Sequence, residues 1–340
     1  MIRRVETVAP GRMRLTSGPA PTPGAGEAVV RVETVGLCGS DYHLYDGTHP
    51  YAHFPQVQGH EVVGRVEAYG PDTDGPPVGT RVVVEPLVAC GRCFACRRGR
   101  YNCCRELKVL GAHLPGGLTE RMVAPAARLH PVDLPPEVAV LVEPVSIGLH
   151  AVNRGEVAAG DTVVVLGAGP IGQAVALAAA DRGARVLFVD RIAARLALAA
   201  AVGAHRTADT TVDDLAASVR DFTDGDGAAV VVDATGAPAL IRAAVDVVAP
   251  SGTVVVAGIS PQEVSIPVSD FSRKEITVAG SRNNAGVFPA AVDLVRRHRQ
   301  RVAGLVTHTF ALDETPAAID YAIAHPEDVE KAVIRVAAAP

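Results

Sequence analysis

Three residues of the stretch 36–61 carry groups that Zn²⁺ accepts as ligands: the Cys38 thiol, the His60 imidazole and the Glu61 carboxylate. The hydroxyl of Ser40 and the imidazole of His43 follow closely after the thiol and could carry a proton. Together these residue types predict a reactive metal site. One thiol and one imidazole far apart in sequence are also typical of a buried cysteine and a core histidine, so the stretch alone leaves both interpretations open.

A second set of thiols is clustered in the segment 90–104. Five of the six cysteines lie here, in the pattern C-x2-C-x2-C followed by a Cys-Cys pair. In a long chain this clustering favours metal ligation over disulfides, and four thiolates close a tetrahedral Zn²⁺ shell with no open position. Nearby arginines would partly offset the negative charge of such a centre: Arg97, Arg98, Arg100 and Arg105. The spacing does not choose between Cys103 and Cys104.

A glycine-rich turn at 167–172 has the pattern G-x-G-x-x-G. The apolar residues before it predict a buried parallel strand, an Ala-rich helix follows, and residues 184–190 predict the next strand. In this setting the glycines permit a tight turn and the close approach of a pyrophosphate, and the helix N-terminus offers N–H groups to the phosphates. The turn therefore predicts a dinucleotide-binding site.

Asp190, at the end of that next strand, bears on the choice of dinucleotide. A carboxylate here accepts hydrogen bonds from the ribose 2′-OH and repels a 2′-phosphate, which favours NAD over NADP. Arg191 could bind a phosphate, but beside Asp190 we expect it to be solvated or stacked on the adenine.

Two kinds of element are expected to position these residues. Before residue 145, short apolar strands separated by Gly- and Pro-rich turns predict a β-rich domain, with a hairpin around 115–117 and a helix at 146–153 that begins after the interruption Glu143-Pro144. Beyond residue 160, strands alternate with helices, including a helix at 196–202 and a helix at 240–248 stopped by Pro250. Repeated units of this kind predict a doubly wound parallel sheet, and hence an α/β protein.

Composition sets further bounds. A length of 340 residues predicts two domains, and a hydrophobic content of 48% with charges of both signs argues against disorder. The net charge of −5 gives no electrostatic footprint for nucleic acid, and no apolar run approaches the roughly 18 residues that a membrane helix needs. We expect a soluble, cytoplasmic protein that binds neither nucleic acid nor membrane.

Taken in order, five groups of residues resemble the motifs of the zinc-containing medium-chain dehydrogenase/reductase superfamily: 36–43, 59–61, 90–104, 143–144 and 167–172. The resemblance covers essentially the whole chain. Segments 102–104, 109–113 and 280–283 are most similar to the polyol and sugar-acid branch, which includes sorbitol dehydrogenases and L-gulonate/L-galactonate 5-dehydrogenases. It implies a GroES-like β-rich catalytic domain at 1–150, with 283–340 returning to it, and an NAD-binding Rossmann domain at 151–282.

The resemblance also implies roles for single residues. It matches Cys38 and His60 to catalytic zinc ligands, and Glu61 and Glu143 to two carboxylates, of which one ligates directly and the other through water or in an alternate state. Because consecutive strand residues face opposite sides, we expect difficulty in turning both His60 and Glu61 toward one ion. The remaining matches are the structural-zinc ligands Cys90, Cys93, Cys96 and Cys104, the proton relay Ser40 and His43, the substrate-side Arg282 and Glu143, and the cofactor-side Gly167, Gly169, Pro170, Ile171, Gly172, Asp190, Arg195, Gly258 and Ile259.

Other roles stay open for six of these residues. Ser40 could simply form a turn, and His43 could be a surface imidazole. Glu61 could stand behind the metal, Glu143 could cap a helix, Arg282 could form a hinge salt bridge, and Arg195 could be an ordinary exposed helix residue.

The activity that the resemblance implies is a zinc-dependent, NAD(H)-dependent interconversion of a secondary alcohol and a ketone on a polyol, sugar acid or related polar substrate. An L-threonine 3-dehydrogenase or a butanediol-type dehydrogenase is the alternative. Leu44 stands where sorbitol dehydrogenases usually carry an aromatic residue, which argues against a sorbitol-like substrate. By analogy with the branch we expect a homo-oligomer, a tetramer or a dimer. A non-catalytic relative would lack a ligand or relay residue, whereas all are present here.

Overall fold

The computed structural model describes residues 1–336, which form two compact units. The first comprises Met1–Glu143 and the tail that returns at Phe288, and the second is Pro144–Val287. These boundaries differ by a few residues from 150/151 and 282/283, the positions expected from the sequence. The first boundary lies within helix α4 (Val142–Arg154), and residues 144–150 are assigned to the second unit with the rest of that helix.

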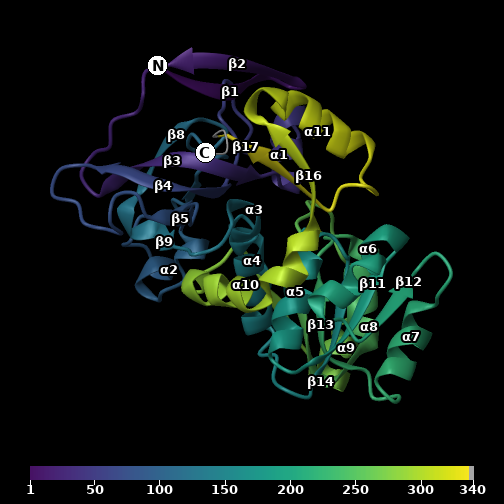
Figure 1. Ribbon diagram of the computed structural model, residues 1–340. Coiled ribbons are helices and arrows are strands. Elements are labelled where there is room, and N and C mark those ends of the chain that lie inside the picture. Colours follow the sequence, from purple (N-terminus) through teal and green to yellow (C-terminus); the bar gives the residue numbers. More distant parts are fainter. Residues whose placement is uncertain (337–340) are drawn as a thin grey trace. The chain divides into compact units, whose positions relative to one another are not determined.

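A seven-stranded sheet is the framework of the first unit. Its strands lie in the order β16-β17-β3-β4-β5-β9, and β8 also pairs with β3. They are β3 (Glu27–Gly36), β4 (Glu61–Tyr69), β5 (Arg81–Val84), β8 (Arg121–Pro125), β9 (Leu129–Pro131), β16 (Val306–Ala311) and β17 (Lys331–Arg335). Strands from the C-terminal tail thus join a sheet built by the first 131 residues, as the yellow and purple-blue arrows of Figure 1 show.

Smaller elements complete this unit. The strands are the antiparallel pair β1 (Ile2–Ala9) and β2 (Arg12–Gly18), and the pair β6 (Leu87–Val88) and β7 (Lys108–Val109). The helices are α1 (Gly39–Asp46), α2 (Phe94–Arg97), α3 (Pro136–Ala139), α10 (Phe288–Val302) and α11 (Thr315–Ala324), with short 3₁₀ turns at 101–103, 126–128, 303–305 and 312–314. Valines of the sheet fill the core, among them Val30, Val62 and Val82, which are fully buried.

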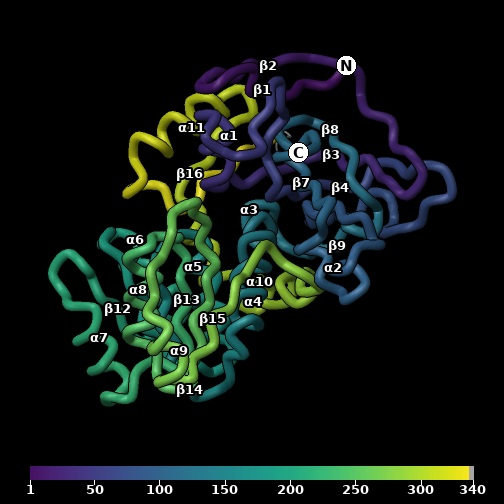
Figure 2. Tube along the Cα trace, turned by 180° about the vertical axis from the view of Figure 1, so that it is seen from behind, coloured from purple at the N-terminus to yellow at the C-terminus, as the bar shows by residue number. Residues whose placement is uncertain are grey.

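A six-stranded parallel sheet forms the second unit, in the order β12-β11-β10-β13-β14-β15. The strands are β10 (Thr162–Leu166), β11 (Arg185–Asp190), β12 (Arg206–Asp209), β13 (Ala228–Asp233), β14 (Val248–Val256) and β15 (Thr277–Gly280). Besides α4, the helices are α5 (Pro170–Asp181), α6 (Ala193–Ala197), α7 (Leu215–Phe222), α8 (Pro238–Val247) and α9 (Val268–Lys274), with a 3₁₀ turn at 199–202. Figure 2 shows β12 and β15 on opposite sides of β13.

The expected fold class is confirmed. Residues 163–166 of β10 are completely buried, as a parallel strand covered on both faces must be. The strand order, in which the sheet grows outward in both directions from β10, is that of the doubly wound nucleotide-binding fold.

Two helix predictions in the second unit had wrong boundaries. Helix α4 begins at Val142, so Glu143 and Pro144 lie in its first turn and do not interrupt it. Proline is tolerated there because the first N–H groups of a helix have no partner within the helix. The helix expected at 196–202 is divided: α6 ends at Ala197 and a 3₁₀ turn covers 199–202.

Two strand predictions were also wrong. Strand β14 already begins at Val248, where Pro250 was expected to mark a break. Its pairing with β13 shifts register there, and this irregularity accommodates the extra residues. No hairpin forms around 115–117, because β7 pairs with β6 and β8 pairs with β3. The glycines of this turn instead donate backbone hydrogen bonds to the carbonyls of Val57 and Gly59.

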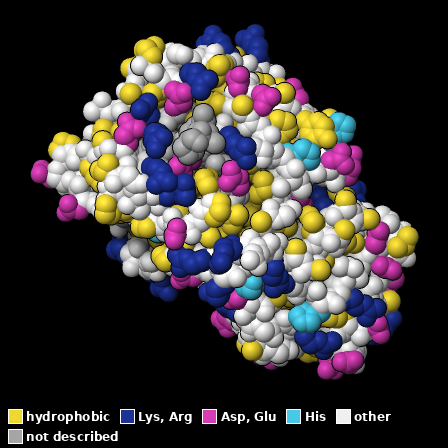
Figure 3. Space-filling model, in the orientation of Figure 1, with side chains coloured by type: hydrophobic (Ala, Val, Ile, Leu, Met, Phe, Trp, Pro, Cys, Tyr) yellow, Lys and Arg dark blue, Asp and Glu magenta, His cyan; other side chains and the backbone are white. Residues whose placement is uncertain are grey.

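Within residues 1–336, none of the helices has the length and apolar character required to cross a bilayer. Acidic and basic side chains are interspersed over the face shown in Figure 3.

Candidate active site

Cys38 and His60 reach the same place because of the way β3 and β4 pair. The two strands are antiparallel with Gly36 opposite Glu61, so the residues just after β3 and just before β4 are neighbours. The donor atoms of Cys38, His60 and Glu61 all lie within 4.8 Å of one another. The difficulty expected for adjacent residues does not arise, because β4 begins at Glu61 and His60 lies before it.

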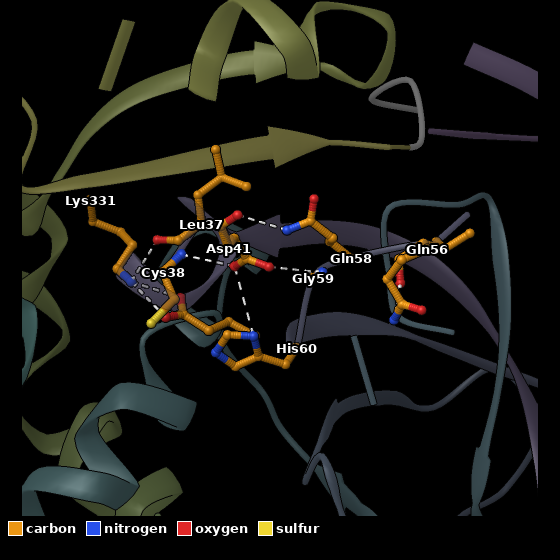
Figure 4. A network of polar contacts seen from close by, with 10 residues as sticks. Leu37, Cys38, Asp41, Gln56, Gln58, Gly59, His60 and Lys331 are labelled. Atoms are coloured by element: carbon orange, nitrogen blue, oxygen red, sulfur yellow. Dashed lines mark hydrogen bonds and ion pairs between the residues drawn. The ribbon is translucent and has the colours of Figure 1, made fainter. Parts of the chain in front are cut away.

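Asp41 holds the two segments together. Its buried carboxylate accepts hydrogen bonds from the backbone N–H of Cys38 at 3.0 Å and from that of Gly59 at 3.2 Å. The same carboxylate lies 3.7 Å from Nδ1 of His60 (Figure 4). A carboxylate on one ring nitrogen directs the other nitrogen, Nε2, toward a metal, which is the usual support of a histidine ligand.

The electrostatic environment of His60 favours positive charge. Burial by itself would lower the pKa of this imidazole, but the Asp41 carboxylate and the Cys38 sulfur raise that pKa well above its usual range. The field that retains a proton there also favours a cation. With a thiol, an imidazole and carboxylates converging, the donor set fits a zinc ion with a position left for substrate.

Glu61 is bound by a residue that sequence reasoning missed. The ammonium of Lys331, on β17, lies 2.6 and 2.9 Å from the two oxygens of Glu61 and donates to the carbonyl of Leu37 at 3.1 Å. Both side chains are about 2% exposed or less. Burial alone would lower the pKa of Lys331, but Glu61 and Cys38 raise it. In this structure, therefore, the Glu61 carboxylate faces a cation of the chain itself.

Glu143 lies at the edge of this cluster. It is buried in the first turn of α4 and is not one of the three residues whose donors lie within 4.8 Å of one another. Burial raises the pKa of its carboxyl to about 7; Glu61 also raises it, whereas His60 and Lys331 lower it. A carboxyl with this pKa can change protonation state near neutral pH.

Ser40 and His43 both lie on α1. Ser40 is half-buried in the first turn, whereas the His43 side chain is 65% exposed, with Nδ1 lying 3.0 Å from Oγ1 of Thr48. The helix therefore leads from the interior, near Cys38, to an imidazole in contact with solvent.

In the cysteine loop 90–104, Cys104 and not Cys103 lies beside the other three thiols. The sulfurs of Cys90, Cys93, Cys96 and Cys104 lie within 4.8 Å of one another, and Cys103 is exposed. Backbone N–H groups lower the pKa of Cys93 to about 6, whereas burial and the neighbouring thiols raise the pKa of Cys96 to about 12. A pocket that holds four sulfurs, with N–H groups stabilising thiolate, fits a closed tetrahedral zinc site.

A buried carboxylate attaches this cysteine loop to the sheet. Glu85 accepts hydrogen bonds from the Tyr101 hydroxyl at 2.7 Å and from Arg128 at 2.9 Å, and lies 3.1 Å from Nε2 of His130. Burial would raise the pKa of Glu85, but these three partners lower it overall. Sequence reasoning missed this group, because its members are separated by 16 to 45 positions and form no motif.

The dinucleotide turn of the second unit has the expected strand–turn–helix form. Gly167 has a φ of 98°, Gly169 is the N-cap of α5, and Pro170 is its first residue. A Cβ on Gly172 would collide with the carbonyl of Gly167, so glycine is required for this close packing. The free N–H groups at the start of α5 can bind phosphate.

Asp190 is oriented by three backbone N–H groups around this turn. They belong to Ala168 at 2.6 Å, Arg191 at 2.7 Å and Ile192 at 2.9 Å. Arg195 is half-buried, and its guanidinium comes so close to Gly169 that a Cβ there would lie 3.7 Å from Nη1. Arg191 is exposed. A carboxylate fixed at the turn and a guanidinium beside it can bind the ribose and phosphate groups of a dinucleotide.

The loops that follow β13 and β14 pack backbone against backbone. Gly236 lies against Ile259, and a Cβ on Gly258 would collide with the backbone of Gly236. Asp233, missed in the sequence, fixes the first loop by accepting hydrogen bonds from Thr235 and from the Gly236 N–H at 3.0 Å. Ile259 is 93% exposed, and Arg282 is exposed as well.

Two of the missed residues differ in how they could have been found. Asp41 follows Cys38 by three positions, which is the spacing of a carboxylate that caps the start of a helix. The sequence therefore contained a local signal for its role. Lys331 lies 270 positions from Glu61, and only the fold brings them together.

Comparison with known proteins identifies the family. Residues 24–135 match the alcohol dehydrogenase GroES-like domain, and residues 170–297 match the zinc-binding dehydrogenase domain. L-galactonate-5-dehydrogenase of Escherichia coli K12 is 38% identical over 77% of this chain and 78% of its own. The alcohol dehydrogenase RspB of E. coli CFT073, solved with NADH, is 30% identical, with a TM-score of 0.92 over 98% of this chain and 99% of its own.

A zinc-binding dehydrogenase of Sinorhizobium meliloti, solved with NADP, is 29% identical, with a TM-score of 0.91 over 99% of both chains. Relatives of this fold thus bind either dinucleotide. The two matched domains together with these relatives show that the chain belongs to the zinc-containing medium-chain dehydrogenase/reductase superfamily, the alcohol dehydrogenases with a GroES-like domain.

Proposed function

We propose that this protein is a zinc- and NAD-dependent dehydrogenase that interconverts a secondary alcohol and a ketone on a polyol, a sugar acid or a related polar compound. One observation carries the proposal: Cys38 and His60 converge beside buried carboxylates, with Asp41 supporting the imidazole, in a chain that also carries a dinucleotide turn.

Cys38 and His60 are the proposed catalytic zinc ligands, and Glu143 is the carboxylate that completes the set directly or through water. For Glu61 we propose the role of the second carboxylate, ligating through water or in an alternate state, because both of its oxygens also bind Lys331. A bound zinc ion would act as a Lewis acid that lowers the pKa of a substrate hydroxyl. Ser40, half-buried two residues after Cys38, would accept the hydroxyl proton, and the exposed His43 would release it to water.

NAD is the proposed cofactor, and its nicotinamide accepts the hydride. The start of α5 would bind the pyrophosphate, and Gly258 and Ile259 are the residues proposed for the nicotinamide end. The Asp190 carboxylate, aligned by its backbone donors, would accept from the ribose 2′-OH and repel a 2′-phosphate. Arg195 contributes a cation to the phosphate side.

Cys90, Cys93, Cys96 and Cys104 are proposed to hold a second, structural zinc ion, since four thiolates leave no position for substrate. On the substrate side, a sugar acid is favoured by the similarity to L-galactonate-5-dehydrogenase and by Arg282, whose guanidinium can bind a hydroxyl or a carboxylate. We also propose a homo-oligomer, which light scattering on the purified protein would establish.

The test is the initial rate of cofactor reduction by the zinc-loaded protein with NAD⁺ or NADP⁺. The panel comprises polyols, aldonates, L-threonine and 2,3-butanediol. The proposal expects the highest kcat/KM with NAD⁺ and a polyol or aldonate. Highest activity with L-threonine or the diol would move the substrate assignment to those classes. A chain that reduces neither cofactor with any of these compounds would contradict the proposal.

A further inference from the structure

Two buried glutamines lie on the segment that leads into His60, and their amides serve different parts of the molecule. Gln56 is 4% exposed and Gln58 is completely buried. The amide of Gln56 donates to the carbonyls of Val57 at 3.2 Å and Leu114 at 3.1 Å. The amide of Gln58 donates to the backbone carbonyl of Asp41 at 2.7 Å, across to α1 (Figure 4).

Thr7, on β1, fixes the orientation of the Gln58 amide. Its hydroxyl, which is also buried, donates to the side-chain oxygen of Gln58. The Asp41 carbonyl can only accept, so the NH₂ group must face Asp41 and the oxygen must face Thr7. The backbone of Thr7 exchanges two hydrogen bonds with Gln56, at 2.8 and 2.9 Å, so β1 holds the whole segment in place.

Both the side-chain carboxylate and the backbone carbonyl of Asp41 are thereby fixed by hydrogen bonds. Its carboxylate binds the N–H groups of Cys38 and Gly59 and faces His60, while its carbonyl is bound by Gln58. An amide buried this deeply is tolerated only if its polar atoms are paired, and here both are. A leucine at position 58 would leave the Asp41 carbonyl without this donor and would let the first turn of α1 move relative to His60.

We propose that Gln58, oriented by Thr7, is a positioning residue for the catalytic metal: it acts through Asp41 to keep the Cys38 thiol and the His60 imidazole at the separation that zinc requires. This inference rests on the proposed function, because it assumes that zinc binds at Cys38 and His60. Groups that support metal ligands in this way typically change metal affinity by about 10–100-fold when they are removed.

The test compares Gln58→Leu with Gln56→Leu. Both changes replace a buried amide on the same segment, but only Gln58 contacts Asp41. Zinc affinity of the Cys38 site is measured by chelator competition, and its geometry by the visible absorption spectrum after Co²⁺ substitution. The structural thiol site serves as an internal reference in each sample. Gln58→Leu should weaken metal binding at the Cys38 site by about 10–100-fold and alter the cobalt spectrum.

Gln56→Leu should leave the zinc affinity and the cobalt spectrum of the Cys38 site close to those of the unaltered protein. Thr7→Val, which removes just the orienting hydroxyl, should weaken binding by an intermediate factor, and Thr7→Ser should restore it. If Gln58→Leu does not fold, the comparison of Thr7→Val with Thr7→Ser tests the inference by the same measurements, zinc affinity and the cobalt spectrum.

Equal zinc affinities in Gln58→Leu and Gln56→Leu, or in Thr7→Val and Thr7→Ser, would overturn the inference while leaving the proposed function intact. Absence of zinc from the Cys38 site of the unaltered protein would instead overturn the proposed function, and this inference with it.

Discussion

Replacing Lys331 with methionine removes the cation that faces Glu61 while keeping most of the side-chain volume. The lysine makes two hydrogen bonds to the Glu61 carboxylate and one to the Leu37 carbonyl, and both charged groups are almost completely buried. Removing one partner of a buried ion pair leaves an uncompensated charge and typically costs about 3–5 kcal/mol. We expect Lys331→Met to lower the free energy of unfolding by about that amount.

The double variant isolates the interaction. Glu61→Gln removes the negative charge, so Lys331→Met should cost much less in that background, with a coupling energy of about 2–3 kcal/mol between the two positions. Urea denaturation of the four proteins at neutral pH, with the Cys38 site free of metal so that zinc cannot compensate the Glu61 charge, measures it. A coupling energy below about 0.5 kcal/mol would refute the view that Lys331 and Glu61 act as a buried pair.

The same variant has a catalytic consequence. The donors of Glu61, Cys38 and His60 lie within 4.8 Å of one another, so a Glu61 carboxylate released from Lys331 would be able to bind a zinc ion held by Cys38 and His60. We expect Lys331→Met to lower kcat, and Lys331→Met with Glu61→Gln to recover part of it. A kcat that the single variant leaves unchanged would contradict the role assigned to Lys331.

Three further predictions follow from the same unit. Gly36→Ala should destabilise the protein by about 1–3 kcal/mol in thermal unfolding, because a Cβ there would overlap the carboxylate that Lys331 fixes in place; an unchanged Tm would count against this packing. Glu85→Gln should cost about 1.5–3 kcal/mol at neutral pH by urea denaturation. The pKa of Glu85 is lowered in the folded protein, so its contribution to stability is present above the usual carboxyl range and is lost as pH falls through the lowered pKa. The difference in unfolding free energy between the unaltered protein and Glu85→Gln should therefore shrink on acidification. A difference that stays constant with pH would be inconsistent with this role. Cys104→Ser should remove one zinc ion per chain by elemental analysis whereas Cys103→Ser should remove none, and the reverse result would reassign the fourth thiol.

The sequence predicted most where local pattern determines structure. The glycines 167–172 and the strands around them form a motif within one βα unit, so the second unit and its doubly wound sheet could be recognised directly. The three-residue spacing of Cys90, Cys93 and Cys96 likewise predicted a cluster of thiols. Boundaries were less predictable where proline occurs, as at Pro144 and Pro250, because its effect depends on whether its missing N–H was needed.

The sequence could not predict interaction partners that only the order of strands in the sheet brings together. Glu61 meets Lys331 because β3 lies between β4 and the C-terminal strand β17, and no local pattern encodes that order. Gln58 and Thr7 are likewise brought together only by the fold, because in the sequence they are an ordinary loop residue and an ordinary strand residue. Candidate metal ligands can therefore be predicted from residue type, whereas the groups that orient them require the fold.

The most direct test of the central claim is the zinc content and turnover of Cys38→Ser. If Cys38 holds the catalytic metal, this variant should retain the structural zinc, lose the other ion, bind NAD⁺ nearly as well as the unaltered protein, and show no measurable kcat on the best substrate of the panel. Both ions retained with an unchanged kcat would contradict the account.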